Sequence, residues 1–504
     1  MMLSKATLDK INTGNDLVPV DELFNLPEKV LQFGTGVLLR GLPDFFIDKA
    51  NKQGLFNGRI AVVKSTSKGT TSEFDDQDNL YTLCIRGIEN GQDVEENIIS
   101  SSISRVIVAE KDWDVILDIA RNPELKLIVS NTTEVGIQLV EESIDQSPPA
   151  SFPAKLLAVL HARYLAFEGS DGAGLAVVAT ELIPDNGKKL EEIVLKLAEF
   201  NSLDARFTAW VKDNVSFCNS LVDRIVPGKP DAATLKALEA ALGYTDQLLS
   251  MAEPYRLWAI EGDTKVTDYL DFAKADEGVV ITEDIELYRE LKVRLLNGTH
   301  TLSCGIAYLS GIETVNNAMR QAELKAYIGQ VMLEEIVPAI PYKIEPAVAV
   351  DFSKKVIDRF ANPHIEHAWI NITAQYSMKL KIRVLPVLLN YYKVKNDVPA
   401  YIAFGFAAYL KFMHPLKKEN NAYYGVLNGH DYVIADDSAP YFFEKMNLPE
   451  AAFADSILKD TEFWGADLSA LPGFVEAVKE NYQSIVKDGM NVALLGLTSS
   501  IKVN

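Results

Sequence analysis

Short apolar runs alternate with helical patterns along the first half of the chain. The runs at 29–33 and 59–64 predict strands, and the residues between them, 38–51, have the apolar spacing of an amphipathic helix. A strand, a helix and a second strand in this order form a βαβ unit, which implies a parallel sheet and a right-handed crossover. The alternation continues with strand patterns at 81–86, 103–108, 125–130 and 174–179 and helical patterns at 111–122 and 153–167. We therefore predict an α/β fold with a Rossmann-type dinucleotide-binding sheet.

The pattern changes beyond about residue 285, where apolar residues recur mostly at helical spacing. Long helical patterns cover 286–309, 318–336, 351–360, 398–413 and 471–487, and strand patterns nearly vanish. The polar run 417–421 predicts a loop. The apolar window 401–410 predicts a buried core helix, because a membrane-spanning helix needs ~20 residues. We predict a Rossmann-type dinucleotide-binding domain at 1–282 and a mainly α-helical substrate and catalytic domain at 283–504.

The charge of the chain narrows the choice of partners. Its 504 residues carry 49 Lys and Arg against 70 Asp and Glu, a formal net charge of −21 at pH 7. This balance argues against nucleic acid or an anionic membrane as the main partner. The three cysteines have no CxxC spacing and the N-terminus has no signal-peptide pattern, so we expect a cytoplasmic protein. We expect a monomer or a homodimer.

A glycine-bearing turn follows the first predicted strand. Gly34 and Gly36 flank Thr35 where a dinucleotide pyrophosphate would meet the start of a helix, and glycine lets both the backbone turn tightly and the phosphate approach. The third position of the G-x-G-x-x-G pattern is Leu39, and a tight turn without a ligand has the same sequence. Lys64 stands where an acid would hold the ribose of NAD, so the residues leave NAD and NADP both open.

A second polar cluster follows the predicted strand at 125–130. Ser130, Asn131, Thr132, Thr133 and Glu134 come directly after the apolar run. They lie at the carboxyl edge of the predicted sheet, where ligands bind in open α/β folds. A capped turn into a helix explains the same pattern equally well.

The segment from Lys292 to His300 carries the strongest candidate chemistry. On an α-helix, Lys292, Asn297 and His300 fall within an arc of about 140°. A buried lysine has a lowered pKa and can act as a base, and an amide can stabilise a developing alkoxide. A histidine can orient a neighbouring hydroxyl, and the set suits the interconversion of an alcohol and a ketone beside a nicotinamide. Spacing alone favours a simpler interpretation, a surface lysine and a satisfied helix histidine.

The sequence favours no metal site. His364 and His367 have the spacing of half a site, but no HExxH pattern or cysteine cluster supports it. We expect these two histidines in a solvated turn beside Pro363.

Several motifs resemble the mannitol dehydrogenase family of polyol-specific long-chain dehydrogenases. The stretch 222–227, Val-Asp-Arg-Ile-Val-Pro, is similar to the family signature, and the spacing of Lys292, Asn297 and His300 is similar to its catalytic lysine motif. Further similar segments lie at 30–36, 130–134, 181–183, 295–298 and 359–363. The resemblance implies a Rossmann-type half and a helical half, with the active site in the cleft between them and no zinc in the reaction.

The resemblance also implies roles for the candidate residues. Lys292 would be the general acid and base, Asn297 would polarise the reacting oxygen, and His300 would hold an adjacent substrate hydroxyl. NAD is the expected cofactor, with NADP not excluded. The residues expected to line its pyrophosphate are Phe33, Gly34, Thr35, Gly36, Val37 and Leu38, and those expected near its nicotinamide end are Asn131, Thr132, Thr133 and Glu134.

The substrate implied by the closest branch of the family is a hexuronate. That branch interconverts D-tagaturonate and D-altronate in hexuronate (galacturonate) catabolism. A cation must then bind the carboxylate, and Lys379, Lys381 and Arg383 are the candidates. Polyol-oxidising members carry an arginine where this chain has Asn371, which disfavours mannitol. The alternatives are fructuronate/mannonate or mannitol/fructose chemistry on the same site, and a non-catalytic nucleotide-binding redox sensor.

Overall fold

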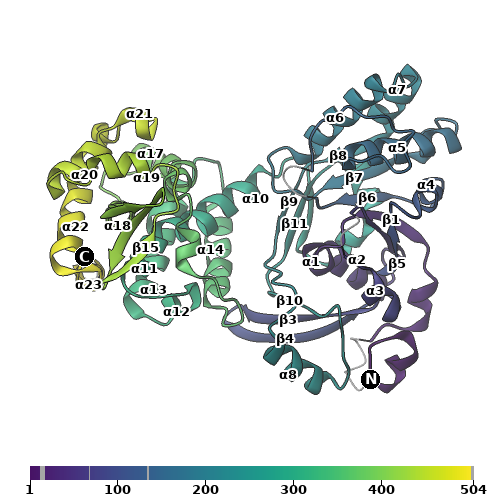
Figure 1. Ribbon diagram of the computed structural model, residues 1–504, viewed down its shortest axis with the longest axis horizontal. Helices are drawn as coiled ribbons and strands as arrows, with labels where there is room; N and C mark the ends of the chain where they lie inside the picture. The colour runs from purple at the N-terminus through teal and green to yellow at the C-terminus, as the bar shows by residue number, and fades with distance from the viewer. Residues whose placement is uncertain (12–17, 67–68, 133–135, 501–504) are drawn as a thin grey trace. The chain divides into compact units, whose positions relative to one another are not determined.

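The computed structural model describes residues 1–11, 18–66, 69–132 and 136–500 (Figure 1). Contacts divide the chain into two compact units. The first unit comprises Met1–Gly87 and Asp93–Ile285, and the second comprises Ile88–Gln92 and Glu286–Asn504. Within the described ranges, no helix is both long enough and apolar enough to cross a membrane.

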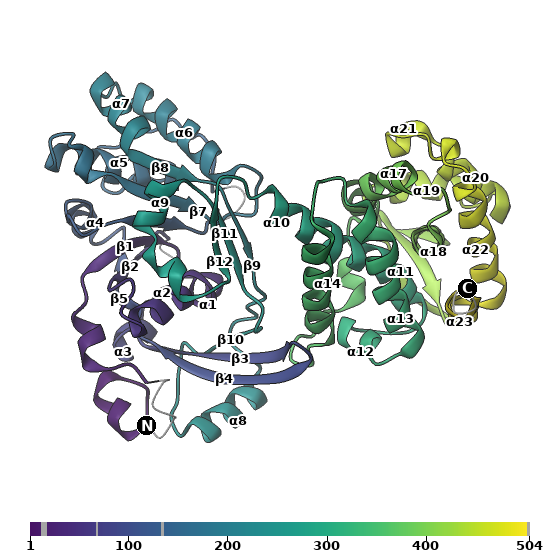
Figure 2. The same ribbon diagram turned by 180° about the vertical axis from the view of Figure 1, so that it is seen from behind.

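The first unit is built on a six-stranded sheet in which every neighbouring pair is parallel. The strand order is β5-β2-β1-β6-β7-β8, the doubly wound order of a Rossmann sheet (Figures 1 and 2). The predicted α/β fold is therefore confirmed. The strands are β1 (Glu28–Phe33), β2 (Arg59–Lys64), β5 (Ile103–Val108), β6 (Leu127–Ser130), β7 (Leu175–Ala179) and β8 (Val215–Cys218).

Both faces of this sheet are covered, which explains the continuous apolar runs in its strands. Leu31 and Phe33 of β1 pack in one core with helices α4, α5, α6 and α7, whereas Val30 packs in a second core with α2. The helices of this unit are α1 (Val37–Gly41), α2 (Pro43–Lys52), α3 (Ser72–Asp76), α4 (Trp113–Ala120), α5 (Phe152–Ala166), α6 (Asn186–Phe200), α7 (Ala205–Asn214), α8 (Ala232–Leu242) and α9 (Thr264–Tyr269). Its short 3-10 turns are η1 (Lys5–Lys10), η2 (Asp21–Asn25), η3 (Asp171–Ala173) and η4 (Asp271–Ala275).

Two predictions for the first unit need correction. The helix predicted at 38–51 is broken at Leu42, because Pro43 has no N–H and its ring disfavours helical backbone in the preceding residue. The strand predicted at 81–86 forms as β3 (Tyr81–Glu89), but it belongs to a separate sheet. That sheet has the order β10-β3-β4, and a third has the order β12-β11-β9. These strands are β4 (Gln92–Ser100), β9 (Ser220–Asp223), β10 (Ser250–Ala252), β11 (Leu257–Glu261) and β12 (Val279–Thr282).

The second unit is mainly helical, as predicted. Helix α18 (Ala400–Phe412) is its buried centre and packs against both α11 and α22 (Figure 2). The other helices are α10 (Glu286–Leu291), α11 (Thr299–Leu309), α12 (Val315–Met319), α13 (Ala322–Gln330), α14 (Pro346–Ala361), α15 (Trp369–Ile372), α16 (Tyr376–Lys379), α17 (Leu385–Val394), α19 (Ala439–Lys445), α20 (Glu450–Leu458), α21 (Thr461–Trp464), α22 (Phe474–Asp488) and α23 (Met490–Ser500), with 3-10 turns η7 (Val337–Ala339) and η9 (Leu468–Ala470).

The loop predicted at 417–421 is wrong. Strand β13 (Lys417–Glu419) pairs antiparallel with β14 (Ala422–Leu427), which pairs with β15 (His430–Val433). Asn420 and Asn421 form the turn with positive φ angles of 47° and 64°, which asparagine tolerates better than most residues. Short, polar strands of this kind give little apolar signal.

Three π-helical segments interrupt the helices of the second unit: η5 (Lys292–Gly298), η6 (Val331–Ile336) and η8 (Leu380–Val384). Two of them end two residues before a proline, η6 before Pro338 and η8 before Pro386. A proline inside a helix displaces the carbonyl four residues earlier and removes its donor, which favours a wider turn.

Candidate active site

The glycine turn lies where the strand order of the main sheet reverses, between β1 and β6. Gly34 has φ = +135°, and a Cβ built on it would lie 3.1 Å from the carbonyl oxygen of Asn131. Its backbone therefore requires glycine. Gly36 is exposed with an ordinary φ of −65°, and a Cβ there would meet nothing within 4 Å.

Gly36 is also the N-cap residue of helix α1, and as a glycine it has no side chain to cap the first turn. The open space above it is thus the kind of backbone cradle that a phosphate group can enter and a methyl group would fill. Thr35, Val37 and Leu38, predicted to line the same ligand, are half-buried around this turn, and Phe33 is buried below it.

The neighbouring strand ends are fixed by a buried carboxylate. Glu181 is 3% exposed and accepts hydrogen bonds from the Ser130 hydroxyl at 3.1 Å, the Thr132 amide at 2.9 Å and the Thr132 hydroxyl at 3.0 Å. Asn131 donates its side-chain amide to the Thr180 hydroxyl at 2.9 Å. The edge predicted to face the nicotinamide is therefore held by side-chain hydrogen bonds at Ser130, Asn131 and Thr132. Of the residues predicted there, Thr133 and Glu134 lie outside the described residues.

Lys64, the residue because of which the sequence did not decide between NAD and NADP, is buried at the end of β2. Its ammonium group donates a hydrogen bond to the backbone carbonyl of Thr66. One of its donors is therefore used within its own turn.

The three candidate catalytic residues do not lie on a regular α-helix. Lys292 and Asn297 belong to the π-helical segment η5, and His300 follows on α11. The predicted α-helical arc is therefore wrong. In a π-helix, hydrogen bonds join residues five apart, so Lys292 and Asn297 are separated by one π-helical turn. Lys292, for which the sequence left both a buried and a surface position open, is half-buried, as is Asn297, whereas His300 is 8% exposed.

His300 is enclosed by aromatic rings. Its ring stacks on Phe360 with centroids 4.1 Å apart and meets His367 edge-on at 5.2 Å and Trp369 at 6.0 Å. Its Nε2 atom is buried and has no hydrogen-bond partner in the described part of the chain. A buried, unpaired ring nitrogen is available to a substrate hydroxyl.

Cationic side chains surround His300. Burial lowers the pKa of His300 well below its usual value, and His367, Arg359, Arg383 and Lys379 lower it further. The imidazole is therefore neutral at pH 7. A neutral ring can donate to or accept from a substrate hydroxyl, depending on its tautomer.

Two of the three predicted carboxylate contacts lie near His300. The Lys379 ammonium donates to the Ile372 carbonyl at 2.9 Å, and Arg383 donates to the Thr301 hydroxyl at 3.3 Å. Lys381 lies elsewhere, with its ammonium 3.6 Å from the centre of the Phe463 ring. The charged groups that act on Lys381 are Asp436 and Asp460.

Sequence reasoning gave no role to two residues at this cluster. Arg359 is 7% exposed on α14, and His367 is half-buried against His300 instead of in the predicted solvated turn, although His364 is exposed. Both lie about 60 residues from His300, so no local spacing could reveal them. Among the described residues, no group of three or more His, Cys, Asp or Glu side chains is placed to hold a metal ion.

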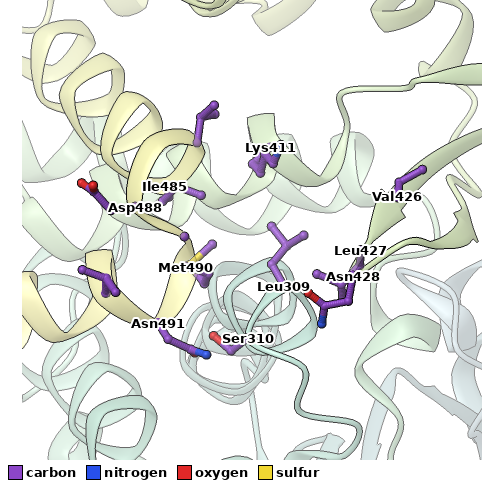
Figure 3. A pocket seen from close by; sticks show the side chains of 13 residues that line it. Leu309, Ser310, Lys411, Val426, Leu427, Asn428, Ile485, Asp488, Met490 and Asn491 are labelled. Carbon is purple, nitrogen blue, oxygen red and sulfur yellow. The ribbon is translucent and has the colours of Figure 1, made fainter.

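A pocket of about 480 Å³ lies at the opposite end of α11 (Figure 3). Leu309, Ser310, Lys411, Asn428 and Met490 are among the residues that line it. None of the candidate catalytic or ligand-binding residues that the structure describes lines this pocket. Leu309 lies nine residues after His300 on the same helix, which corresponds to roughly 13 Å along the helix axis.

Comparison with known proteins identifies the family. Residues 28–273 match the model of the mannitol dehydrogenase Rossmann domain, and residues 284–486 match that of the mannitol dehydrogenase C-terminal domain. The chain belongs to the mannitol dehydrogenase family. The resemblance found in the sequence is thus confirmed, and the chain is an oxidoreductase that acts on CH–OH groups.

Relatives within the mannitol dehydrogenase family narrow the comparison. An altronate oxidoreductase of Halalkalibacterium halodurans is 36% identical over 489 residues, covering 95% of both chains. An altronate oxidoreductase of Bacillus subtilis is 37% identical over 480 residues, covering 94% of this chain and 96% of its own.

Solved structures share the fold of the mannitol dehydrogenase family. Mannitol 2-dehydrogenase of Pseudomonas fluorescens, in a ternary complex with NAD and D-mannitol, superposes with a TM-score of 0.67 at 23% identity, covering 99% of this chain and 100% of that chain. A D-sorbitol dehydrogenase in substrate-free form gives a TM-score of 0.76 at 21% identity, covering 98% of this chain and 100% of that chain.

Proposed function

We propose that this protein is an NAD-dependent altronate oxidoreductase, or tagaturonate reductase, of hexuronate (galacturonate) catabolism. The observation that carries the proposal is a pair of cations four residues apart, Lys379 and Arg383, of which Arg383 donates to the hydroxyl of Thr301, next to the buried His300, at 3.3 Å. A polyol offers no charge for such a pair, whereas a hexuronate carries a carboxylate. The altronate oxidoreductases among the relatives support the same substrate.

The proton is moved by Lys292. It donates a proton to the reacting oxygen when tagaturonate is reduced and takes one from it when altronate is oxidised. Asn297 donates its amide hydrogen to the same oxygen and stabilises the charge that develops there. The neutral ring of His300 holds an adjacent hydroxyl through its unpaired Nε2.

The cofactor is a nicotinamide dinucleotide. When bound, it supplies or accepts the hydride. Gly34 to Leu38 hold its pyrophosphate, with the open space at Gly36 leaving room for phosphate oxygens. Asn131 and Thr132 lie towards the nicotinamide end. We propose NAD because the mannitol 2-dehydrogenase of similar fold was solved with NAD; the hydrogen bond from Lys64 to its own turn uses only one of the three donors of its ammonium group.

The remaining parts of the proposal concern the whole chain. The Rossmann-type domain spans 1–282 and the catalytic domain 283–504. The protein is cytoplasmic and acts as a monomer or a homodimer, on a small hexuronate rather than on nucleic acid or a membrane. Fructuronate/mannonate and mannitol/fructose remain the rival substrates, and a redox sensor without turnover is the rival from another class.

Substitution of the three cations tests the choice of substrate. Lys379→Met and Arg383→Gln should each raise the KM for tagaturonate by about 10-fold or more, because each removes a charge-assisted contact. Lys381→Met is the matched control and should leave that KM within twofold, since its ammonium group rests on Phe463. Steady-state assays with NADH measure all three. Unchanged KM values for Lys379→Met and Arg383→Gln would remove the basis for a hexuronate.

A further inference from the structure

Two π-helical segments that carry the proposed chemistry are tied together by one guanidinium group. Arg294 lies in η5 and is 9% exposed. Its Nη1 donates to the carbonyl oxygens of Ile382 at 2.6 Å and Arg383 at 3.1 Å, both in η8. Segments η5 and η8 pack directly against each other.

The same guanidinium group is held on its other side by Glu290. Its Nε donates to Glu290 Oε2 at 3.0 Å and its Nη2 to Glu290 Oε1 at 2.9 Å. This bidentate pair fixes the plane of the guanidinium group, so that Nη1 can point only towards η8. Both side chains are about nine-tenths buried, so removal of either one would leave the charge of the other buried and uncompensated.

One of the two carbonyls that Arg294 binds, that of Ile382, has lost its α-helical donor. In an α-helix, the amide of residue 386 would donate to the carbonyl of residue 382, but Pro386 has no N–H. The ring of Pro386 also pushes that carbonyl away from the helix axis. Arg294 therefore supplies the hydrogen bond that Pro386 cannot, from a different helix.

We propose that Arg294 is a positioning residue for the reaction, with Glu290 orienting it. The proposal rests on the proposed function. Segment η5 holds Lys292 and Asn297, and η8 holds Arg383, next to Lys379. The Arg294 bridge thus fixes the separation between the acid/base lysine and the group that anchors the carboxylate. A lysine at 294 cannot reproduce it, because one ammonium group lacks the planar set of donors.

Kinetics of Arg294→Lys and Glu290→Gln test this role. Arg294→Lys should lower kcat/KM for tagaturonate by about 10-fold or more, with a lower kcat and a higher KM for the hexuronate, because small displacements of bound groups are costly. The KM for NADH should stay within twofold. Glu290→Gln should shift the same parameters by less. Lys355→Gln, which breaks an exposed i,i+4 pair with Asp351 in the same unit, is the control and should change nothing.

A double-mutant cycle separates positioning from general destabilisation. If Arg294 acts through the anchor, Arg294→Lys should cost less than about threefold in an Arg383→Gln background. The inference would be overturned if the losses in kcat/KM caused by Arg294→Lys and Arg383→Gln multiply in the double variant. It would also be overturned if Arg294→Lys alone stays within twofold of the wild type. Neither result would affect the proposed function. A wild type without activity on any hexuronate would overturn both. If Arg294→Lys does not fold, the same cycle with Glu290→Gln decides.

Discussion

Gly34 and Gly36, two residues apart, are glycines for different reasons. Gly34→Ala forces a side chain into a left-handed backbone, 3.1 Å from the Asn131 carbonyl oxygen, and should cost about 1–3 kcal/mol of stability. The methyl group of Gly36→Ala would contact no protein atom within 4 Å, so the melting temperature of this variant should be unchanged. The same methyl group would occupy the space proposed for the phosphate. Calorimetry and NADH titration by fluorescence measure both effects.

The expected result is a split between stability and binding. Gly36→Ala should weaken NADH binding by about 10-fold with no loss of stability. Wild-type affinity in Gly36→Ala would mean that the pyrophosphate does not approach this turn.

Asp44 is a buried acid behind the same turn. It is fully buried, Gln32 donates to it at 3.4 Å, and its Oδ1 has no partner in the described part of the chain. Burial raises the pKa of Asp44 to about 8. The hydrogen bond from Gln32 and the charge of Arg40 lower this pKa, but by less than burial raises it. The folded state therefore keeps a proton that the unfolded state loses near pH 4.

The free energy of unfolding should consequently fall as the pH rises from about 4 to 8, because the folded state must keep Asp44 protonated or bury its charge. Asp44→Asn removes this dependence, so its melting temperature should exceed that of the wild type at pH 8, by an amount that shrinks at pH 5. The free-energy gain at pH 8 should be on the order of 1–3 kcal/mol. Thermal melts across this pH range measure it. A difference that does not change with pH would show that Asp44 is not the titrating group.

At the scale of elements, the buried parallel strands from β1 to β7 of the main sheet were the easiest features to predict. The boundaries of β2 and β5 match the predicted ranges, because buried parallel strands are continuous apolar runs between polar ends. Helix existence was also predictable, but helix interruptions were not. The break at Leu42 and the π-helical segment η8 each precede a proline, Pro43 and Pro386, whose consequences the periodicity alone does not contain.

The candidate site was predictable only where its residues are neighbours in sequence. Lys292, Asn297 and His300 were found from one motif, and Lys379 and Arg383 from another. Arg359 and His367 reach His300 through tertiary packing of segments about 60 residues away, which one sequence does not encode locally. The separation of Lys381 from Arg383 also depends on how η8 is oriented.

Helix α18, the centre of the second unit, offers a test at the same scale. The Glu335 carboxylate accepts hydrogen bonds from the backbone amides of Tyr401 and Ile402 at 2.8 and 2.7 Å. It thereby caps the first turn of helix α18. Glu335→Ala leaves two buried amides unpaired and should cost about 2–4 kcal/mol. Glu335→Gln keeps one acceptor and should cost less. Equal melting temperatures for wild type and Glu335→Ala would refute the capping role.

At the scale of the whole molecule, the net charge of −21 contrasts with the proposed ligands, which are both anions. The second unit resolves this contrast locally, because the cations Arg359, Lys379 and Arg383 surround His300. Net charge argues against nucleic acid as the main partner but does not indicate the substrate, and the cationic cluster at His300 gives the more specific information.

The most direct test of the account is kcat/KM of the purified protein for tagaturonate, fructuronate and fructose, measured with NADH and with NADPH. Lys292→Ala provides the baseline and should lose about 100-fold or more. We predict that tagaturonate with NADH is preferred over each alternative by at least ~10-fold. A preference for fructose or fructuronate, or a Lys292→Ala variant that turns over as fast as the wild type, would contradict it.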